Sequence, residues 1–138
     1  MNALSAHVLT LGENDWQKYW PIAAEMIAPA CELSGGRHTL ESTKAKLSNG
    51  DYVLLVAIVG NSVNSACVCG IKQYPAADWL SIILCGGDNM LQWLDSGRLA
   101  IERLARLHNC VGLEVIGRPG WKRAMDLTPS GVVMERRL

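Results

Sequence analysis

The sequence is 138 residues long, enough for one hydrophobic core of ordinary size and too short for two independent domains. Thirteen lysine and arginine residues balance thirteen aspartate and glutamate residues, so no overall charge favours nucleic acid or an anionic membrane. No apolar run approaches the ~20 residues that span a bilayer, and residues 1–11 lack the pattern of a secretion signal. We therefore expect one soluble domain over residues 1–138 with no membrane binding and no indication of nucleic-acid binding, although local charged patches could still bind either.

The first third of the chain predicts a strand followed by two helices. His7–Leu11 is a short apolar strand. Pro21 lacks the amide hydrogen of a continuous helix, which predicts a turn over Trp16–Trp20 and a helix that begins at Pro21. Thr39 is suited to cap a second helix that runs through Leu47. The core face of the first helix is expected to consist of Ile22, Met26, Ile27 and Ala30.

Three strands are predicted in the middle of the chain. Tyr52–Val59 is almost continuously apolar and β-branched, as in a strand covered on both faces. Val63–Tyr74 predicts its antiparallel neighbour, and Trp79–Leu84 the third strand of the meander.

A long helix and a further strand follow the meander. Asp88 or Asn89 can cap the helix, and Asn109 can take the left-handed conformation that ends it. Val111–Ile116 predicts a strand parallel to Trp79–Leu84, because the intervening helix carries the chain back along the sheet. The apolar stripe of the helix is Leu91, Leu94, Ile101, Leu104 and Ala105.

The chain is expected to end in a turn, a short helix and a last strand. Arg118–Trp121 has proline and glycine where a type II turn needs them. A short helix over Trp121–Leu127 and a strand over Val132–Leu138 complete the predicted elements.

Five cysteines, an odd number, lie mostly in apolar runs, which indicates reduced thiols and a reducing compartment. Cys67 and Cys69 fall on one strand face, as half of a metal site would. No second pair or matching histidine stands at ligand spacing, so buried small residues explain them better and no metal is expected.

The element order β-α-α-β-β-β-α-β-α-β resembles the GNAT superfamily of acyl-CoA-dependent N-acyltransferases. This resemblance covers nearly the whole chain and implies an α+β fold with a central mixed sheet flanked by helices. Within it, the stretch from WL through IERLAR and His108-Asn109-Cys110 to LEVIGRPGW is similar to GNAT-like proteins encoded by tailed bacteriophages. That similarity rests on about thirty residues and implies a virion or virion-associated protein.

The resemblance also implies where acetyl-CoA would bind. Active GNAT members hold the cofactor pyrophosphate with Gln/Arg-x-x-Gly-x-Gly/Ala between the fourth strand and the long helix. The equivalent residues here are Cys85, Gly86, Gly87 and Asn89, with Asp88 among them. The glycine spacing differs, no basic residue is present, and a carboxylate ~4 Å from a phosphate is repelled by about 1 kcal/mol even in water. Asp88 is better explained as a helix cap.

Two carboxylates are candidate catalytic bases. In the GNAT family a carboxylate on the fourth or fifth strand can take a proton from the amine, which implicates Asp78 and Glu114. For Glu114 a structural ion pair with Arg118 or Lys72 is the alternative. The family's tyrosine general acid has no counterpart between residues 121 and 127.

Arg118, Trp121 and Trp93 are candidate interface residues, because tryptophan and arginine are enriched at interface centres. Trp121 could equally close the end of the core.

Two functions follow. The first is a GNAT-fold protein that has lost acetyl-CoA binding, needs no cofactor, and acts in a phage virion or the host cytoplasm through contacts with other virion proteins or its own copies. The alternative is an acetyl-CoA-dependent N-acetyltransferase of a small amine or a protein N-terminus.

Overall fold

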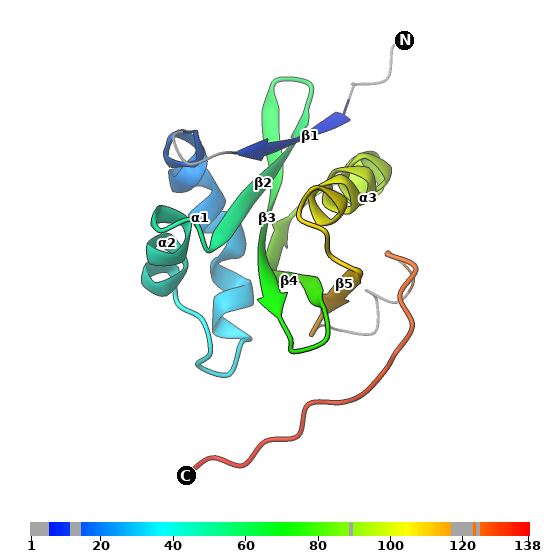
Figure 1. Ribbon diagram of the computed structural model, residues 1–138. Coiled ribbons are helices and arrows are strands. Elements are labelled where there is room, and N and C mark those ends of the chain that lie inside the picture. The colour runs from blue at the N-terminus through cyan, green and yellow to red at the C-terminus, as the bar shows by residue number, and fades with distance from the viewer. Residues whose placement is uncertain (1–5, 12–14, 89, 117–122, 124) are drawn as a thin grey trace.

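The computed structural model describes residues 6–11, 15–88, 90–116, 123 and 125–138 (Figure 1). Its elements in chain order are β1 (Ala6–Leu11), α1 (Trp16–Glu32), α2 (Leu40–Ser48), β2 (Tyr52–Val59), β3 (Ser62–Gln73), β4 (Asp78–Gly87), α3 (Met90–Leu107) and β5 (Gly112–Val115).

The strands form one mixed sheet in the order β1-β2-β3-β4-β5. The first four strands are antiparallel neighbours, while β5 lies parallel to β4 because α3 carries the chain back between them. The predicted meander and the predicted parallel unit are both confirmed.

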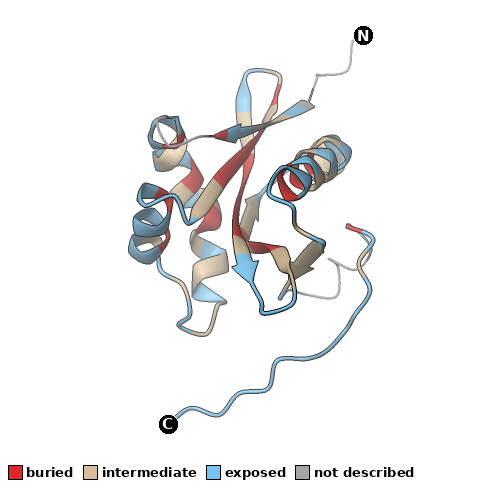
Figure 2. Cartoon of the chain, in the orientation of Figure 1, coloured by how far each residue is buried: buried red, intermediate tan, exposed pale blue. Residues whose placement is uncertain are grey.

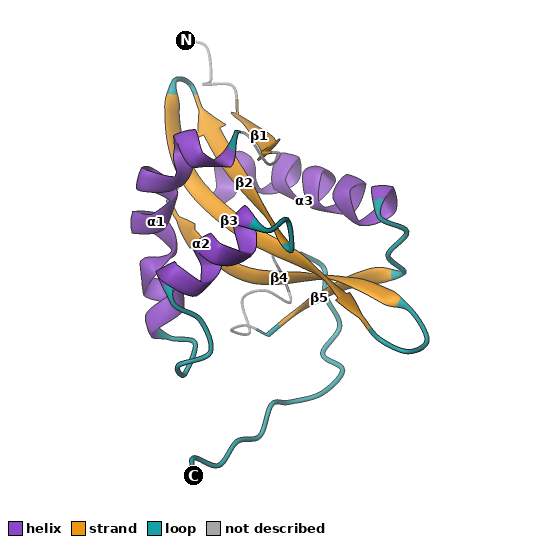
Figure 3. Cartoon of the chain, turned by 60° about the vertical axis from the view of Figure 1, so that its left-hand side comes forward, coloured by secondary structure: helices purple, strands orange, loops and turns teal. Residues whose placement is uncertain are grey.

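Helices cover both faces of the sheet. Helices α1 and α2 lie on one face and α3 on the other (Figures 1 and 3). Adjacent residues of β2 face opposite cores: Leu54 packs with Ile27 of α1, and Leu55 packs with Ile101 of α3. Figure 2 shows that burial concentrates on the strands and on the helix sides that face them. The predicted α+β class, with a mixed sheet between helices, is confirmed.

Helix α1 begins earlier than the sequence predicts. It runs unbroken through Pro21, and Trp16 is only 3% exposed. Trp16 and Trp20 form an edge-to-face pair with ring centroids 6.0 Å apart. Burial of this first turn therefore outweighs the hydrogen bond that proline removes. Of the predicted core face, Ile27 is buried and Met26 and Ala30 pack against the core, whereas Ile22 is 39% exposed and Ala23 is buried instead.

Local signals at two helix ends are confirmed. Thr39 accepts the amide hydrogen of Ser42, and the Ser42 hydroxyl accepts that of Thr39, which forms a capping box. Asn109 takes the left-handed conformation after α3, with φ 57°.

The predicted last strand is wrong. Residues 127–138 have no regular secondary structure, and Val132–Leu138 is exposed throughout. A strand needs an edge to pair with, and its local propensity is weak on its own. This tail instead runs to the loop between α1 and α2 (Figure 1). Of the predicted helix over Trp121–Leu127, residues 121, 122 and 124 lie outside the described residues, and residues 125–127 are not helical.

Candidate functional site

Strand β4 extends beyond its parallel neighbour. Pairing with β5 ends at Ile82 and Val115, whereas β4 continues to Gly87. A register shift against β3 leaves Ile83 as an extra residue at this point. Among the described strands none pairs with the β5 side of β4 beyond Ile82. Its amide and carbonyl groups there form an edge that an extended ligand with amide groups can pair with.

Glu114 lies one residue before the end of this pairing, on the sheet face that carries α1 and α2. Its strand neighbours Leu113 and Val115 face α3, so Glu114 faces the other way. It is half-buried and stands opposite Ser81 of β4, which in turn stands opposite Gly70 of β3. Gly70, Ser81 and Glu114 thus form a row across three neighbouring strands, and Glu114 contributes a carboxylate to it.

The hydrogen-bond partner of Glu114 is Tyr74, from the hairpin between β3 and β4. The phenol oxygen lies 2.9 Å from both carboxylate oxygens, so the hydroxyl can donate to either. This hydrogen bond, together with partial burial and the carboxylate charge, raises the pKa of Tyr74. Of the two predicted partners, Arg118 lies outside the described residues; among the described side chains, Tyr74 rather than Lys72 contacts Glu114.

Asp78, the second candidate base, is placed apart from Glu114. It begins β4 in alternation with Leu80 and Ile82, which both pack under α3, so it lies on the α3 side of the sheet. Its carbonyl accepts the amide hydrogen of Val111, and its charge adds to burial in raising the pKa of Cys110. The two carboxylates therefore belong to different faces.

The turn after β4 is explained largely by packing. A Cβ atom on Gly86 would lie 1.9 Å from the carbonyl oxygen of Met26 in α1. Gly87 has φ 132°, and its Cβ would lie 2.4 Å from the Cα of Ser65. The Asp88 amide donates to the Asn64 carbonyl at 2.7 Å. These glycines let α1 and β3 approach closely, whatever else they do.

The structure places two of the remaining residues predicted for the cofactor and the interface, Cys85 and Trp93. Hydrogen bonding to Cys67 and burial raise the pKa of Cys85 well above its usual range, so its thiol stays protonated. Trp93 is half-buried over Gly97, and its indole N–H donates to the Asp88 carbonyl at 2.9 Å. Asn89, Arg118 and Trp121 lie outside the described residues.

A small apolar cavity of about 30 Å³ lies between α3 and the sheet. Cys67, Cys85 and Trp93 are among the residues that line it. Cys67 and Cys69 are buried as predicted, with their sulfur atoms 3.8 Å apart. Across the described part of the chain, no three potential ligands gather to hold a metal ion.

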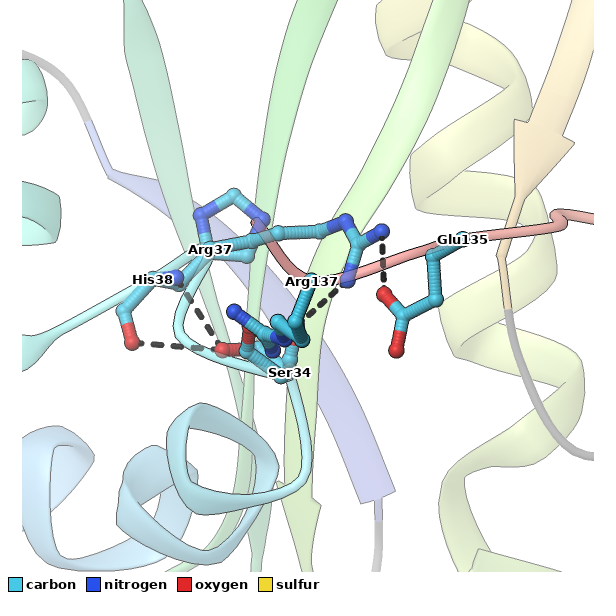
Figure 4. Close-up of polar contacts among 6 residues, drawn as sticks. Ser34, Arg37, His38, Glu135 and Arg137 are labelled. Carbon is cyan, nitrogen blue, oxygen red and sulfur yellow. Dashed lines mark hydrogen bonds and ion pairs between the residues drawn. The ribbon is translucent and has the colours of Figure 1, made fainter.

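The loop between α1 and α2 brings together residues that the sequence did not single out. Ser34 holds the loop: its hydroxyl donates to the Cys31 carbonyl at 2.7 Å and accepts the His38 amide hydrogen at 3.0 Å (Figure 4). Arg37 forms an ion pair with Glu135 of the tail at 2.8 Å. No local signal joins residues that lie so far apart in sequence.

The sequence matches no family model and no curated protein. The fold is nevertheless similar to solved acetyltransferases. An aminoglycoside acetyltransferase from an uncultured soil sample, in complex with sisomicin, superposes with a TM-score of 0.68 at 14% identity over 96% of both chains. A predicted acetyltransferase with acetyl-CoA from Clostridium acetobutylicum gives 0.66 at 12% identity, again over 96% of both.

A glucosamine-6-phosphate N-acetyltransferase from Arabidopsis thaliana gives a TM-score of 0.60 at 14% identity, over 96% of this chain and 98% of that one. No helix in the described residues is long and apolar enough to cross a membrane. On this structural likeness, the chain has the GNAT acetyltransferase fold.

Proposed function

We propose that this protein is an acetyl-CoA-dependent N-acetyltransferase that acts on an amine. The proposal rests chiefly on Glu114, a half-buried carboxylate near the end of the β4–β5 pairing and within hydrogen-bond distance of Tyr74. Solved proteins of the same fold are acetyltransferases, and one of them holds acetyl-CoA, which supports the same proposal.

The described residues fit acetyl-CoA in part. The β4 edge beyond Ile82 offers backbone groups to the amide-containing arm of the cofactor. The N-terminus of α3 favours an anion, but Asp88 places a carboxylate there. The backbone amide of Asp88 is also already hydrogen-bonded to the Asn64 carbonyl. Ile83–Gly87 would therefore hold the arm, while the phosphates would be held weakly.

When bound, acetyl-CoA supplies an activated acyl carbon whose bond to sulfur breaks as the new bond to nitrogen forms. Glu114 accepts the proton that the amine loses, directly or through one water. Tyr74 holds the Glu114 carboxylate in place and keeps its own proton, since its pKa is raised. The thiolate leaving group takes a proton from solvent. Asp78, on the other face, has no part in this step.

Release of free thiol from acetyl-CoA by the purified protein, across a broad panel of amines, tests this function. We expect turnover that depends on both protein and amine. A rate that stays at background for every amine would overturn the proposal.

A second candidate is a GNAT-fold protein that works without acetyl-CoA, as a virion component through protein contacts. The virion role rests on the sequence resemblance alone. The turn from Cys85 to Asp88 favours loss of the cofactor, because packing explains its glycines and its charge repels phosphate. Calorimetry with acetyl-CoA separates the candidates: saturable binding supports the enzyme, and its absence supports the binding protein.

A further inference from the structure

Basic side chains gather at the α1–α2 loop. Arg37 and His38 lie on the loop and Arg137 on the tail (Figure 4), while Lys72 lies near the end of β3. Burial lowers the pKa of His38, and the charges of Arg37 and then Lys72 lower it further. An anion brought to these positive charges would be favoured.

A carboxylate already occupies this position. Glu135 places an oxygen 2.8 Å from the Arg37 guanidinium, and Arg137 donates to the Gly35 carbonyl. Arg37 and Glu135 remain about half exposed, at 47% and 51% of their side-chain surfaces. The segment that delivers Glu135 has no secondary structure, so little besides these contacts holds it in place.

Lys72 shares a sheet face with Glu114, and the α1–α2 loop lies on the same side, since α1 and α2 cover that face (Figures 1 and 3). Lys72 stands opposite Trp79, which stands opposite Gly112, and Glu114 follows two residues later on β5. Trp79 lies on the same face, with its ring against Gly112, since a Cβ atom on Gly112 would lie 2.5 Å from that ring. Two strand spacings across and two residues along separate the Cα atoms of Lys72 and Glu114 by roughly 12 Å. Their side chains can shorten this gap to the length of a small molecule.

We propose that the acceptor amine carries an anionic oxygen group, a carboxylate or a phosphate, which Arg37 binds in place of the Glu135 carboxylate. The amine then lies toward Glu114, and Lys72 adds positive charge along the way. This inference rests on the proposed N-acetyltransferase function, because it assigns the substrate class of that site. Arginine suits the role, since its planar guanidinium matches both carboxylate and phosphate.

Matched pairs of amines test the inference, with thiol release as the readout. Each pair differs only in the anion: γ-aminobutyrate and its amide, O-phosphoethanolamine and ethanolamine, a dipeptide and its C-terminal amide. We expect kcat/KM to be about tenfold higher for the anionic member. The carboxylate and phosphate arms show which anion fits, and compounds of different length show the spacing.

Three variants connect the preference to Arg37. Arg37→Ala should abolish the difference within each pair, and Arg37→Glu should reverse it toward cationic amines. Arg103→Ala, an exposed arginine of α3 on the other face, should leave it unchanged. Glu135→Gln should lower KM for anionic acceptors by about two- to fivefold, without effect on neutral ones, because it removes the competing carboxylate.

The outcomes distinguish a failure of the anionic-acceptor inference from a failure of the proposed acetyltransferase function. Turnover without preference for the anionic member, or a preference that survives in Arg37→Ala, overturns the inference and leaves the acetyltransferase function standing. No turnover with any amine overturns the function itself, and the inference with it.

Discussion

The two ends of β4 differ in what they contribute. At its start, β4 and β5 lie side by side and carry polar residues on one face, with Glu114 hydrogen-bonded to Tyr74. At its end, Gly86 and Gly87 are surrounded by backbone atoms of α1 and β3. The first end carries Glu114, whose side chain is suited to proton transfer. The glycines at the second end are explained by close packing. A glycine pair at the expected place is thus weaker support for cofactor binding than a half-buried carboxylate is for catalysis.

Removing the carboxylate at the first end should have the largest effect. Glu114→Gln keeps the size of the side chain but cannot accept the amine proton, so kcat/KM should fall by about 10²- to 10³-fold. Thiol-release kinetics measure this. Glu102→Gln on α3 is the control and should stay near the parent rate. Equal activity in Glu114→Gln would show that this carboxylate is not the base.

A methyl group at the second end should destabilise the fold. Gly86→Ala places a Cβ against the Met26 carbonyl, and the shift needed should lower the free energy of unfolding by about 2–3 kcal/mol. Gly131→Ala has no atom within 4 Å of its Cβ and should change stability by less than about 0.5 kcal/mol. Urea denaturation compares them. Equal stability of the two variants would contradict the close approach of α1.

Tyr74→Phe tests the role of the Tyr74 hydroxyl at the first end of β4. It removes the hydroxyl that holds the Glu114 carboxylate but leaves the base itself, so we expect kcat/KM to fall only by about three- to tenfold. Tyr19→Phe on α1 serves as the control. A loss as large as that of Glu114→Gln would give Tyr74 a direct part in the chemistry.

Asp88→Asn tests the effect of the Asp88 charge at the second end of β4. If acetyl-CoA phosphates approach the start of α3, loss of this carboxylate should tighten binding by up to about fivefold. Calorimetry measures the change, and Asp95→Asn farther along α3 is the matched control. Weaker binding in Asp88→Asn would mean that Asp88 assists the cofactor site.

The smallest effect concerns the tail. The hydrogen bond and charge of Arg37 hold the pKa of Glu135 below its usual range, and Arg137 adds to this. A lowered pKa in the folded state means that the contact stabilises the docked tail above the unfolded pKa and is lost as the pH falls through the folded pKa. In an NMR titration, Arg37→Ala should raise the pKa of Glu135 toward that of an ordinary carboxyl group.

Lys46→Ala, which removes the ion pair with Asp51, is the control and should leave the Glu135 pKa unchanged. An unaltered Glu135 pKa in Arg37→Ala would contradict the docked position of the tail.

Elements with local signals were predictable, and contacts between distant segments were not. The β-branched run Tyr52–Val59 and the Thr39 cap carry their information within a few residues, and both are confirmed. The start of α1 was missed because burial of Trp16 outweighs the local effect of Pro21. The missing last strand has a similar cause, since strand formation depends on tertiary packing more than on local propensity.

In the candidate site, too, the residue with a local signal was predictable and its contacts with distant segments were not. A carboxylate in an apolar strand pointed to Glu114, but its partner Tyr74 lies 40 residues away and follows only from the register of β3, β4 and β5. Arg37 and Glu135 are joined by the path of the tail, which no sequence period encodes.

Titration of acetyl-CoA into the purified protein, followed by calorimetry, tests the central claim most directly. We expect saturable binding of one acetyl-CoA per chain with a micromolar dissociation constant. The absence of saturable heat at millimolar acetyl-CoA would contradict the acetyltransferase function and favour a GNAT fold used for protein contacts alone.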